Sequence, residues 1–235
     1  MFTVLRLLLR GADPESVATA LAAEADGIWE GVAGEPGARL RVLALQPGLA
    51  ERTPHARVMR GAPFEAALEI GIEDAPLTRI IETADGLGER LGPAVDLGAS
   101  YALAGREYVF SPGDTDTVLF VVIGRDLSLG FEDHHRHWLN RHGWLVKPGA
   151  DASGTGYRQF HADPKASSFA ARRSGVGRHE FEGIAVACYP DADGYLRVMS
   201  NADRLAPILE DERRFIDMET SSPGLYSTVL RRDAA

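Results

Sequence analysis

The segment TVLFVVI, residues 117–123, constrains the fold more than any other part of the sequence because it is apolar on both sides. Successive side chains of a β-strand point to opposite faces of the sheet. Val118 and Phe120 would therefore share one face, while Leu119 and Val121 share the other. A strand of this kind must be covered on both faces, so the fold needs a packed layer on each side of it.

The predicted elements run through one pattern twice. Periodicity and turn residues predict strands at 2–9, 38–45, 64–72 and 100–110, with helices at 14–25 and 75–91. Further strands are predicted at 117–123, 156–162, 181–189 and 225–232, with helices from 131 to about 147 and within 201–216. Each half of the chain then has the order β-α-β-β-α-β, which is the ferredoxin-like unit.

The two units together predict one closed architecture. A ferredoxin-like sheet carries its helices on one face, so the simplest cover for the other face is the sheet of the other half. The predicted fold is α+β, with tandem ferredoxin-like (βαββαβ) repeats forming an α+β barrel around a cavity within one chain. The turn SPGD at residues 111–114 marks the joint. It divides the chain into an N-terminal half, residues 1–112, and a C-terminal half, residues 113–235.

Charge and cysteine content exclude several classes of function. The chain has 34 acidic and 25 basic residues and a formal net charge of −9, whereas nucleic acids and anionic membranes attract clustered positive charge. No apolar run approaches the roughly 20 residues of a membrane-spanning helix. Cys188 is the only cysteine, which rules out an internal disulfide and favours the cytoplasm. It shares an apolar strand face with Ile184 and Val186 and is interpreted as core.

Four of the seven histidines lie in FEDHHRHWLNRHGWLV, residues 131–146. A metal pair on a helix needs ligands at i and i+4, and no histidine here has such a partner, so no metal site is predicted. On a helical projection, Phe131, Trp138 and Leu145 form the buried stripe. His135 and His137 are interpreted as satisfied or partly exposed helix residues.

Two further patterns point to acid–base chemistry. His142 lies on the buried face near the helix end, just before Gly143, and an imidazole turned to the interior titrates near neutrality. In the strand GYRQFHA, Tyr157, Gln159 and His161 share one face. They form either a solvated face or the wall of a polar pocket, and the two-sided burial of residues 117–123 favours the pocket.

At these residues the sequence resembles the EthD family of the dimeric α+β barrel superfamily. The helix matches the family pattern F-x-x-Y-W-x-x-x-H-G/A-P at Trp138, His142 and Gly143, and the strand motif Y-x-Q-x-H is complete at 157–161. The pattern is broken where His134, His137 and Trp144 replace Phe, Tyr and Pro. The segments FEG (181–183) and DERRFID (211–217) also match, so that the resemblance covers about residues 117–232. DERRFID itself is interpreted as a solvated, salt-bridged helix end, with Asp211 and Glu212 at a pocket rim as the alternative.

The resemblance implies the fold and a pocket, in a superfamily that includes cofactor-free enzymes of aromatic polyketides. The favoured hypothesis is an enzyme that acts without a cofactor on an aromatic or polyketide-like small molecule held in the barrel cavity. The favoured reaction is that of a lyase or isomerase, by dehydration, cyclisation or decarboxylation. The expected catalytic residues are His142, His161 and Tyr157, and the expected substrate-binding residues are Arg6, Trp138, Gln159 and His134. The two histidines would form the acid–base pair, and Arg6 would anchor a carboxylate unless it lies at a strand edge in solvent.

Two alternatives stay open. The first is a monooxygenase of the same barrel type, in which the substrate itself activates oxygen or a haem does so with His135 or His142 as axial ligand. The second is a protein that binds a hydrophobic metabolite and leaves it unchanged. A homodimer is compatible with every one of these functions.

Overall fold

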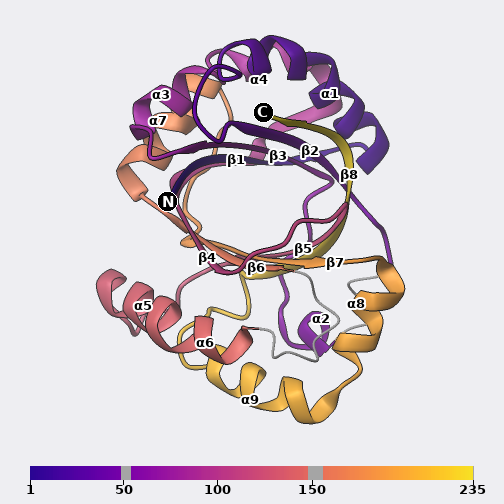
Figure 1. Ribbon diagram of the computed structural model, residues 1–235, viewed down its shortest axis with the longest axis vertical. Helices are drawn as coiled ribbons and strands as arrows, with labels where there is room; N and C mark the ends of the chain where they lie inside the picture. Colours follow the sequence, from indigo (N-terminus) through magenta and orange to yellow (C-terminus); the bar gives the residue numbers. More distant parts are fainter. Residues whose placement is uncertain (49–53, 148–155, 235) are drawn as a thin grey trace.

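Strands from both halves of the chain close into one antiparallel barrel in the computed structural model, which describes residues 1–48, 54–147 and 156–234 (Figure 1). The order around the barrel is β1 (Phe2–Gly11), β3 (Ala66–Glu73), β2 (Arg39–Leu45), β8 (Ser222–Asp233), β5 (Thr117–Ile123), β7 (Gly183–Tyr189), β6 (Gly156–Ala162) and β4 (Val95–Ser111), which pairs again with β1. Each half contributes four neighbouring strands in the same relative order, β4-β1-β3-β2 and β8-β5-β7-β6. The predicted tandem ferredoxin-like barrel is therefore confirmed.

The seams between the two sheets are the pairs β2–β8 and β4–β6, both antiparallel. β4 ends at Ser111 and β5 begins at Thr117, so the proposed joint between residues 112 and 113 falls between these strands. Because the seams are as continuous as the pairings inside each sheet, the division into two domains stays a prediction about folding units.

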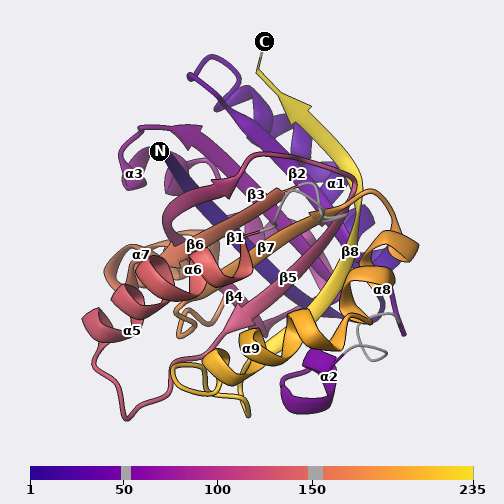
Figure 2. The same cartoon turned by 60° about the horizontal axis from the view of Figure 1, so that its bottom comes forward.

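The helices lie outside the barrel in two groups (Figure 1). The N-terminal sheet is covered by α1 (Pro14–Glu30), α3 (Leu77–Glu82) and α4 (Leu87–Leu91). The C-terminal sheet is covered by α5 (Phe131–His137), α6 (Gly143–Val146), α8 (Ala192–Met199) and α9 (Ala202–Glu212), which come forward in Figure 2. The helix predicted at 75–91 is two short ones because Gly86, with φ 63°, interrupts it before α4. Among the described residues, the helices are all too short or too polar to cross a bilayer.

Two segments cross from one half to the other. α2 (Pro54–Val58), between β2 and β3, lies among the helices of the C-terminal half, whereas α7 (Pro164–Ser174), between β6 and β7, packs on the N-terminal sheet (Figure 1). The sequence reading missed α2, α7 and α8. For α7 a signal existed, since Asp163 caps the helix and Pro164 follows at its first position, as Asp13 and Pro14 do for α1.

Packed side chains fill the inside of the barrel, where the sequence predicted a cavity. Val118 and Phe120 point inward with Phe160, Val186 and the other members of a fully buried cluster. The alternate side chains of β5 point outward into a second cluster beneath the helices. The predicted two-sided cover of this strand is correct, but the inner cover is a solid core and the expected chamber is absent from the described part of the barrel.

Candidate functional site

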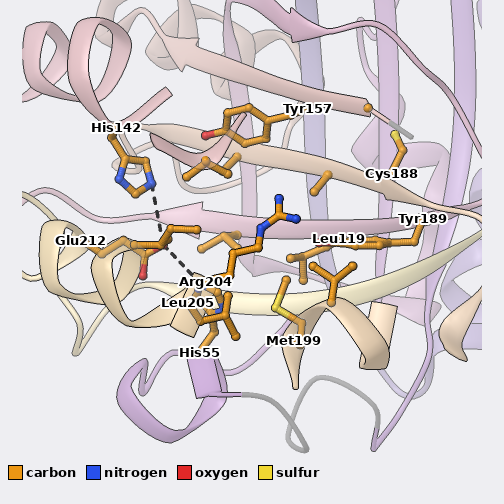
Figure 3. A pocket seen from close by; sticks show the side chains of 17 residues that line it. His55, Leu119, His142, Tyr157, Cys188, Tyr189, Met199, Arg204, Leu205 and Glu212 are labelled. Atoms are coloured by element: carbon orange, nitrogen blue, oxygen red, sulfur yellow. Dashed lines mark hydrogen bonds and ion pairs between the residues drawn. The ribbon is translucent and has the colours of Figure 1, made fainter. Parts of the chain in front are cut away.

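A small pocket lies outside the barrel, between the outer face of the C-terminal sheet and its helices (Figure 3). Its cavity volume is about 70 Å³. Apolar side chains make most of its wall, among them Leu119, Val121, Ala185, Ala187, Met199, Leu205 and Ile208. The polar side chains that line it include His55, His142, Tyr157, Tyr189, Arg204 and Glu212. An apolar wall with a few converging polar groups is typical of a small-molecule site.

A π-helical turn sets the direction of His142. Between α5 and α6, residues Trp138–His142 are π-helical, and the Gly143 N–H donates to the Trp138 carbonyl oxygen five residues earlier. This turn adds one residue to the helical repeat, a feature frequent at functional sites. Trp138 and His142 stay buried, but Leu145 is 41% exposed. The prediction that Leu145 continues the buried stripe is wrong because the extra residue rotates everything after it by about 100°.

The His142 ring lies between two carboxylates. Its Nδ1 is 3.1 Å from Asp211 Oδ2, and its Nε2 is 3.8 Å from Glu212 Oε1. Burial lowers the pKa of His142, although both carboxylates oppose this shift. A neutral imidazole that donates its Nδ1 proton to Asp211 keeps a lone pair on Nε2, at the pocket wall. His142 can therefore accept a proton there.

Asp211 and Glu212 are buried, so the interpretation of DERRFID as a solvated helix end is wrong at its first two residues. Burial would raise the pKa of Asp211, but hydrogen bonds from His137 and His142 outweigh it and lower this pKa. Arg141 adds an ion pair at 3.0 Å. Asp211 is thus held ionised against His142, while Glu212 lines the pocket as the alternative interpretation proposed.

His55 was missed by the sequence reading, although it brings the N-terminal half into the pocket. Its Nε2 lies 3.2 Å from Glu212 Oε1 (Figure 3). Burial would lower the pKa of His55, but the charge of Glu212 and the hydrogen bond to it raise this pKa overall. The five-residue helix around His55 is too short to give a periodic signal, and the crossing of α2 to the other half is a tertiary feature.

Tyr157, Gln159 and His161 share one face of β6, but it is the outer face and not the barrel interior that the sequence analysis expected. Of the three, only Tyr157 lines the pocket. Burial raises the pKa of the Tyr157 phenol. His161 lies on the far side of Trp138, with the two rings stacked 4.2 Å apart, and it borders a separate surface groove. Desolvation lowers the pKa of His161 to about 2. The structure therefore does not bring His142 and His161 together as a pair facing one cavity.

Three expected substrate contacts lie elsewhere. Arg6 is fully buried inside the barrel, with Nε 2.9 Å from Glu69 Oε2 and Nη2 2.6 Å from Glu107 Oε2. Both interpretations of Arg6, as a carboxylate anchor and as a solvated residue, are thus corrected, because its partners are carboxylates of the protein itself. Trp138 and His134 are buried beneath the helix and do not line the pocket.

His134 has a structural contact instead. Its Nδ1 lies 3.0 Å from the Phe215 carbonyl oxygen, to which it donates, and desolvation lowers its pKa to about 4. Arg204, which the sequence reading also missed, points its guanidinium group into the pocket (Figure 3). No carboxylate of the described residues lies within ion-pair distance of Arg204. It is the cation of the pocket that is open to a ligand.

Neither histidine that was proposed as an axial ligand is placed to bind a haem. Both ring nitrogens of His135 are engaged, Nδ1 with His161 and Nε2 with Glu182. His142 is directed at a pocket of about 70 Å³, far smaller than the roughly 300–1,000 Å³ of sites for larger ligands. Within the described ranges, no group of three or more His, Cys, Asp or Glu side chains is placed to hold a metal ion.

Comparison with known families gives a match over part of the chain. Residues 127–219 match the family model described as the EthD domain. No curated protein matches the sequence. An anthrone oxidase-like protein has a similar structure, with a TM-score of 0.63 and 10% identity over 100% of this chain and 93% of the other.

Two further solved structures share the fold. A protein from Lactobacillus acidophilus NCFM, provisionally assigned as a monooxygenase, has a TM-score of 0.55 and 8% identity over 99% of this chain and 96% of its own. A dye-decolorizing peroxidase from Bacteroides thetaiotaomicron has a TM-score of 0.53 and 11% identity over 96% and 92%. At such identities the likeness is one of fold. Residues 127–219 are therefore similar to the EthD domain, and the chain as a whole has the fold of the dimeric α+β barrels.

Proposed function

We propose that the protein is an enzyme that removes a proton from a small, anionic carbonyl compound without a cofactor, as an isomerase or lyase does. The observation that carries this proposal is the pairing of His142 and Tyr157 in one apolar pocket, with Asp211 behind the imidazole. A proton acceptor and a hydroxyl donor that face the same enclosed space can share the two ends of an enolisation.

His142 would act as the base through Nε2. When it takes a proton from the substrate it becomes an imidazolium, which Asp211 stabilises through Nδ1–H, 3.1 Å away. Tyr157 stays protonated because burial raises its pKa, so its hydroxyl can donate to the oxygen on which negative charge develops. The apolar wall strengthens both interactions by excluding water.

Arg204 supports an anionic substrate. Its guanidinium group faces the pocket without an ion-pair partner among the described residues, and guanidinium binds carboxylates in a bidentate manner. Arg204 thus takes the anchoring role that the sequence suggested for Arg6. A cavity of about 70 Å³ favours a compact substrate over a polyketide of several rings.

Two outcomes follow from one proton abstraction. If His142 returns the proton to another carbon, the double bond moves and the reaction is an isomerisation. If a hydroxide leaves the carbon next to the carbanion, it combines with the proton from His142 as water, and the reaction is a dehydration. Each path leaves His142 neutral at the end of the cycle.

A second candidate is a monooxygenase that uses the same first step. The fold similarity to an anthrone oxidase-like protein favours this alternative. A substrate carbanion could react with dioxygen to a peroxide, which loses water and leaves a ketone, so that CH₂ and O₂ become C=O and H₂O. The protein would again supply the base and the oxyanion donor.

The test is hydrogen exchange at carbon. Small ketones with and without a carboxylate group are incubated with the protein in deuterated water, and deuterium incorporation beside the carbonyl is followed by NMR. We expect deuterium exchange with the carboxylate-bearing ketones. The exchange rate should be about 10²–10⁴-fold lower for His142→Gln. Arg204→Met should need a higher ketone concentration to reach half of its maximal rate. His179→Gln, outside the pocket, is the matched control.

Three results would decide against the enolisation. They are exchange no faster than in buffer, full exchange by His142→Gln, and tight binding of a ketone that stays unchanged, which would favour a binding protein. Oxygen uptake with the same small ketones, lost in His142→Gln, would select the monooxygenase.

A further inference from the structure

A continuous row of hydrogen bonds runs from the surface groove to the pocket. Glu182 Oε2 lies 3.2 Å from His135 Nε2, and His135 Nδ1 lies 2.6 Å from His161 Nδ1. His161 Nε2 is 3.1 Å from Gln159 Oε1, and Gln159 Nε2 is 2.9 Å from the Tyr157 hydroxyl oxygen. We call these five residues the donor chain. It links the wall of the pocket to His135, which borders the groove outside Trp138.

One end of the donor chain is fixed by a group that can only accept. Gln159 Nε2 lies 3.1 Å from the Trp138 carbonyl oxygen, so this end of the amide must be the NH₂ group. Its second hydrogen is then directed at Tyr157, whose oxygen accepts it. The amide oxygen faces His161, so His161 Nε2 must carry a hydrogen.

The other end is fixed in the same way. Desolvation lowers the pKa of His161 and keeps the ring neutral. With its one hydrogen on Nε2, its Nδ1 is an acceptor, and His135 Nδ1 must donate to it. His135 Nε2 faces the Glu182 carboxylate, which also only accepts. His135 therefore carries hydrogens on both nitrogens and is a cation paired with Glu182.

Every donor in the chain points toward the pocket. The order is His135 to His161, His161 to Gln159 and Gln159 to Tyr157. Since Tyr157 accepts from Gln159, its own hydrogen is left to point into the pocket. Hydrogen bonds aligned in one direction polarise one another, and this row begins at a positive charge.

We propose that Glu182, His135, His161 and Gln159 are positioning residues that make the Tyr157 hydroxyl a preset donor to an oxyanion in the pocket. The inference deepens the proposed function and rests on it for its role in turnover. It also reassigns His161 and Gln159, which orient Tyr157 and do not touch the substrate themselves.

The surroundings of the chain agree with this assignment. Desolvation, with the neighbouring histidines, lowers the pKa of His161 to about 2, so this ring stays neutral. Burial would raise the pKa of Glu182, but hydrogen bonds from His135 and Arg125 lower it, so the carboxylate stays ionised. The stacked Trp138 ring holds the His161 plane in place.

The first test reads the protons directly. Long-range nitrogen–proton NMR of the histidine-labelled full-length protein distinguishes the two neutral tautomers from the imidazolium. We expect His161 as the Nε2–H tautomer and His135 protonated on both nitrogens, and Glu182→Gln should return His135 to a neutral form. A His161 with its hydrogen on Nδ1 would overturn the proposal whatever the catalytic activity is.

The second test measures the donor at the pocket end with 4-nitrophenol, whose phenolate absorbs visible light. The protein should bind the phenolate more tightly than the phenol. We expect Tyr157→Phe to weaken phenolate binding by about 10–100-fold and His135→Phe or His161→Phe by roughly 3–10-fold. Arg136→Ala, on the exposed side of the same helix, should leave binding unchanged.

A double variant separates positioning from a general structural role. In a Tyr157→Phe background, His161→Phe should have no further effect on phenolate binding, because its influence passes through the lost hydroxyl. Additive losses would reject the donor chain. If NMR and phenolate binding agree with the chain but Tyr157→Phe exchanges ketone protons at the normal rate, the proposed function fails and the donor chain stands.

Discussion

The two halves of the barrel have the same strand order but differ in how their outer faces are covered. In the N-terminal half, α1, α3, α4 and α7 pack on the sheet in one apolar cluster that includes Leu7, Leu21 and Ile80. In the C-terminal half, α6, α8 and α9 leave the pocket open, and six of the seven histidines belong to this half. One architecture thus supports a solid layer on one side and a candidate active site on the other.

The difference comes from side-chain size and helix geometry more than from topology. α1 packs through alanines and aliphatic residues such as Val17 and Leu21, which fill the space above the sheet. In the C-terminal half, the small side chains of Ala185 and Ala187 leave space above the outer face of β7. The π-helical turn at Trp138–His142 directs the His142 imidazole toward this space. A pocket forms where small side chains on the sheet lie opposite a helix that does not close on them.

The two halves also depend on each other. α2 carries His55 from the N-terminal half to Glu212, and α7 covers the N-terminal sheet with Ala170 and Ala171. The two crossing segments occupy equivalent places in the two halves, between the second and third strands. Neither half on its own would keep its outer face covered, which argues for one cooperative folding unit.

The largest expected effect comes from the same substitution made in each half. Leu21→Ala removes a fully buried side chain of the solid layer and should lower the free energy of unfolding by about 2–5 kcal/mol. Leu205→Ala should cost near the lower end of that range, because Leu205 already borders the pocket and loses fewer contacts. Denaturant unfolding of both variants measures the difference.

Ligand binding provides the control for this pair. Leu21→Ala should keep wild-type affinity for 4-nitrophenolate, since Leu21 is remote from the pocket, whereas Leu205→Ala should change it. Equal stability losses together with equal changes in affinity would mean that the two outer layers are not different in kind.

The sequence predicted the barrel from two local signals, the strand at 117–123 that is apolar on both faces and the repeated order of elements. A closed barrel is the simplest fold that satisfies both. The sequence also placed Trp138 and His142 correctly on the buried face of their helix. The predicted burial of Leu145 was wrong, because no sequence pattern indicated the π-helical turn before it. The interpretation of Arg6 was also wrong, because Glu69 and Glu107 are distant in sequence and meet Arg6 only across the closed barrel.

The sequence also could not predict which face of the sheet carries the candidate site. Alternation shows that Tyr157 and Gln159 share a face of β6, but not whether that face looks into the barrel or toward the helices. Only the packing of Phe160 and Arg158 inside the barrel decides it. His55 and Arg204 depend on the crossing of α2 and on the docking of α9, which are long-range events without a sequence motif.

A smaller effect is expected when the pocket is filled to imitate the solid half. Ala187→Leu would add three carbons on the outer face of β7, which is close to what a cavity of about 70 Å³ can accept. We expect the free energy of unfolding to rise by about 2 kcal/mol and 4-nitrophenolate binding to be lost. A destabilised variant that still binds the phenolate would show that the site lies elsewhere.

The smallest expected effect is a loss of stability at acidic pH that arises in the C-terminal half. His134 is buried and its pKa is lowered by desolvation to about 4 from 6.5. The unfolded chain therefore binds a proton at this residue between pH 6.5 and 4 while the folded protein does not. The contribution of His134 to stability is full above pH 6.5 and is lost as the pH falls to 4, at about 1.4 kcal/mol per pH unit.

Between pH 6.5 and 4.5, the other groups with shifted pKa values do not obscure the effect of His134. The pKa values of Glu69 and Glu107 are lowered from 4.5, so they lose stability only below it. His55 has a raised pKa, so its contribution is already complete at pH 6.5. His142 and His161, with lowered pKa values, add to the slope in the same direction as His134.

His134→Asn isolates the share of one ring, because asparagine keeps a donor for the Phe215 carbonyl but does not titrate. Between pH 6 and 5, the free energy of unfolding of this variant should fall by about 1.4 kcal/mol less than that of the wild type. Hydrogen exchange over the same range should open the amides of α5 and β6 before those of α1, whose half has only His55. Equal loosening of α1 would mean that acid acts on the barrel as a whole, and the contrast between the two outer layers would not extend to their stability.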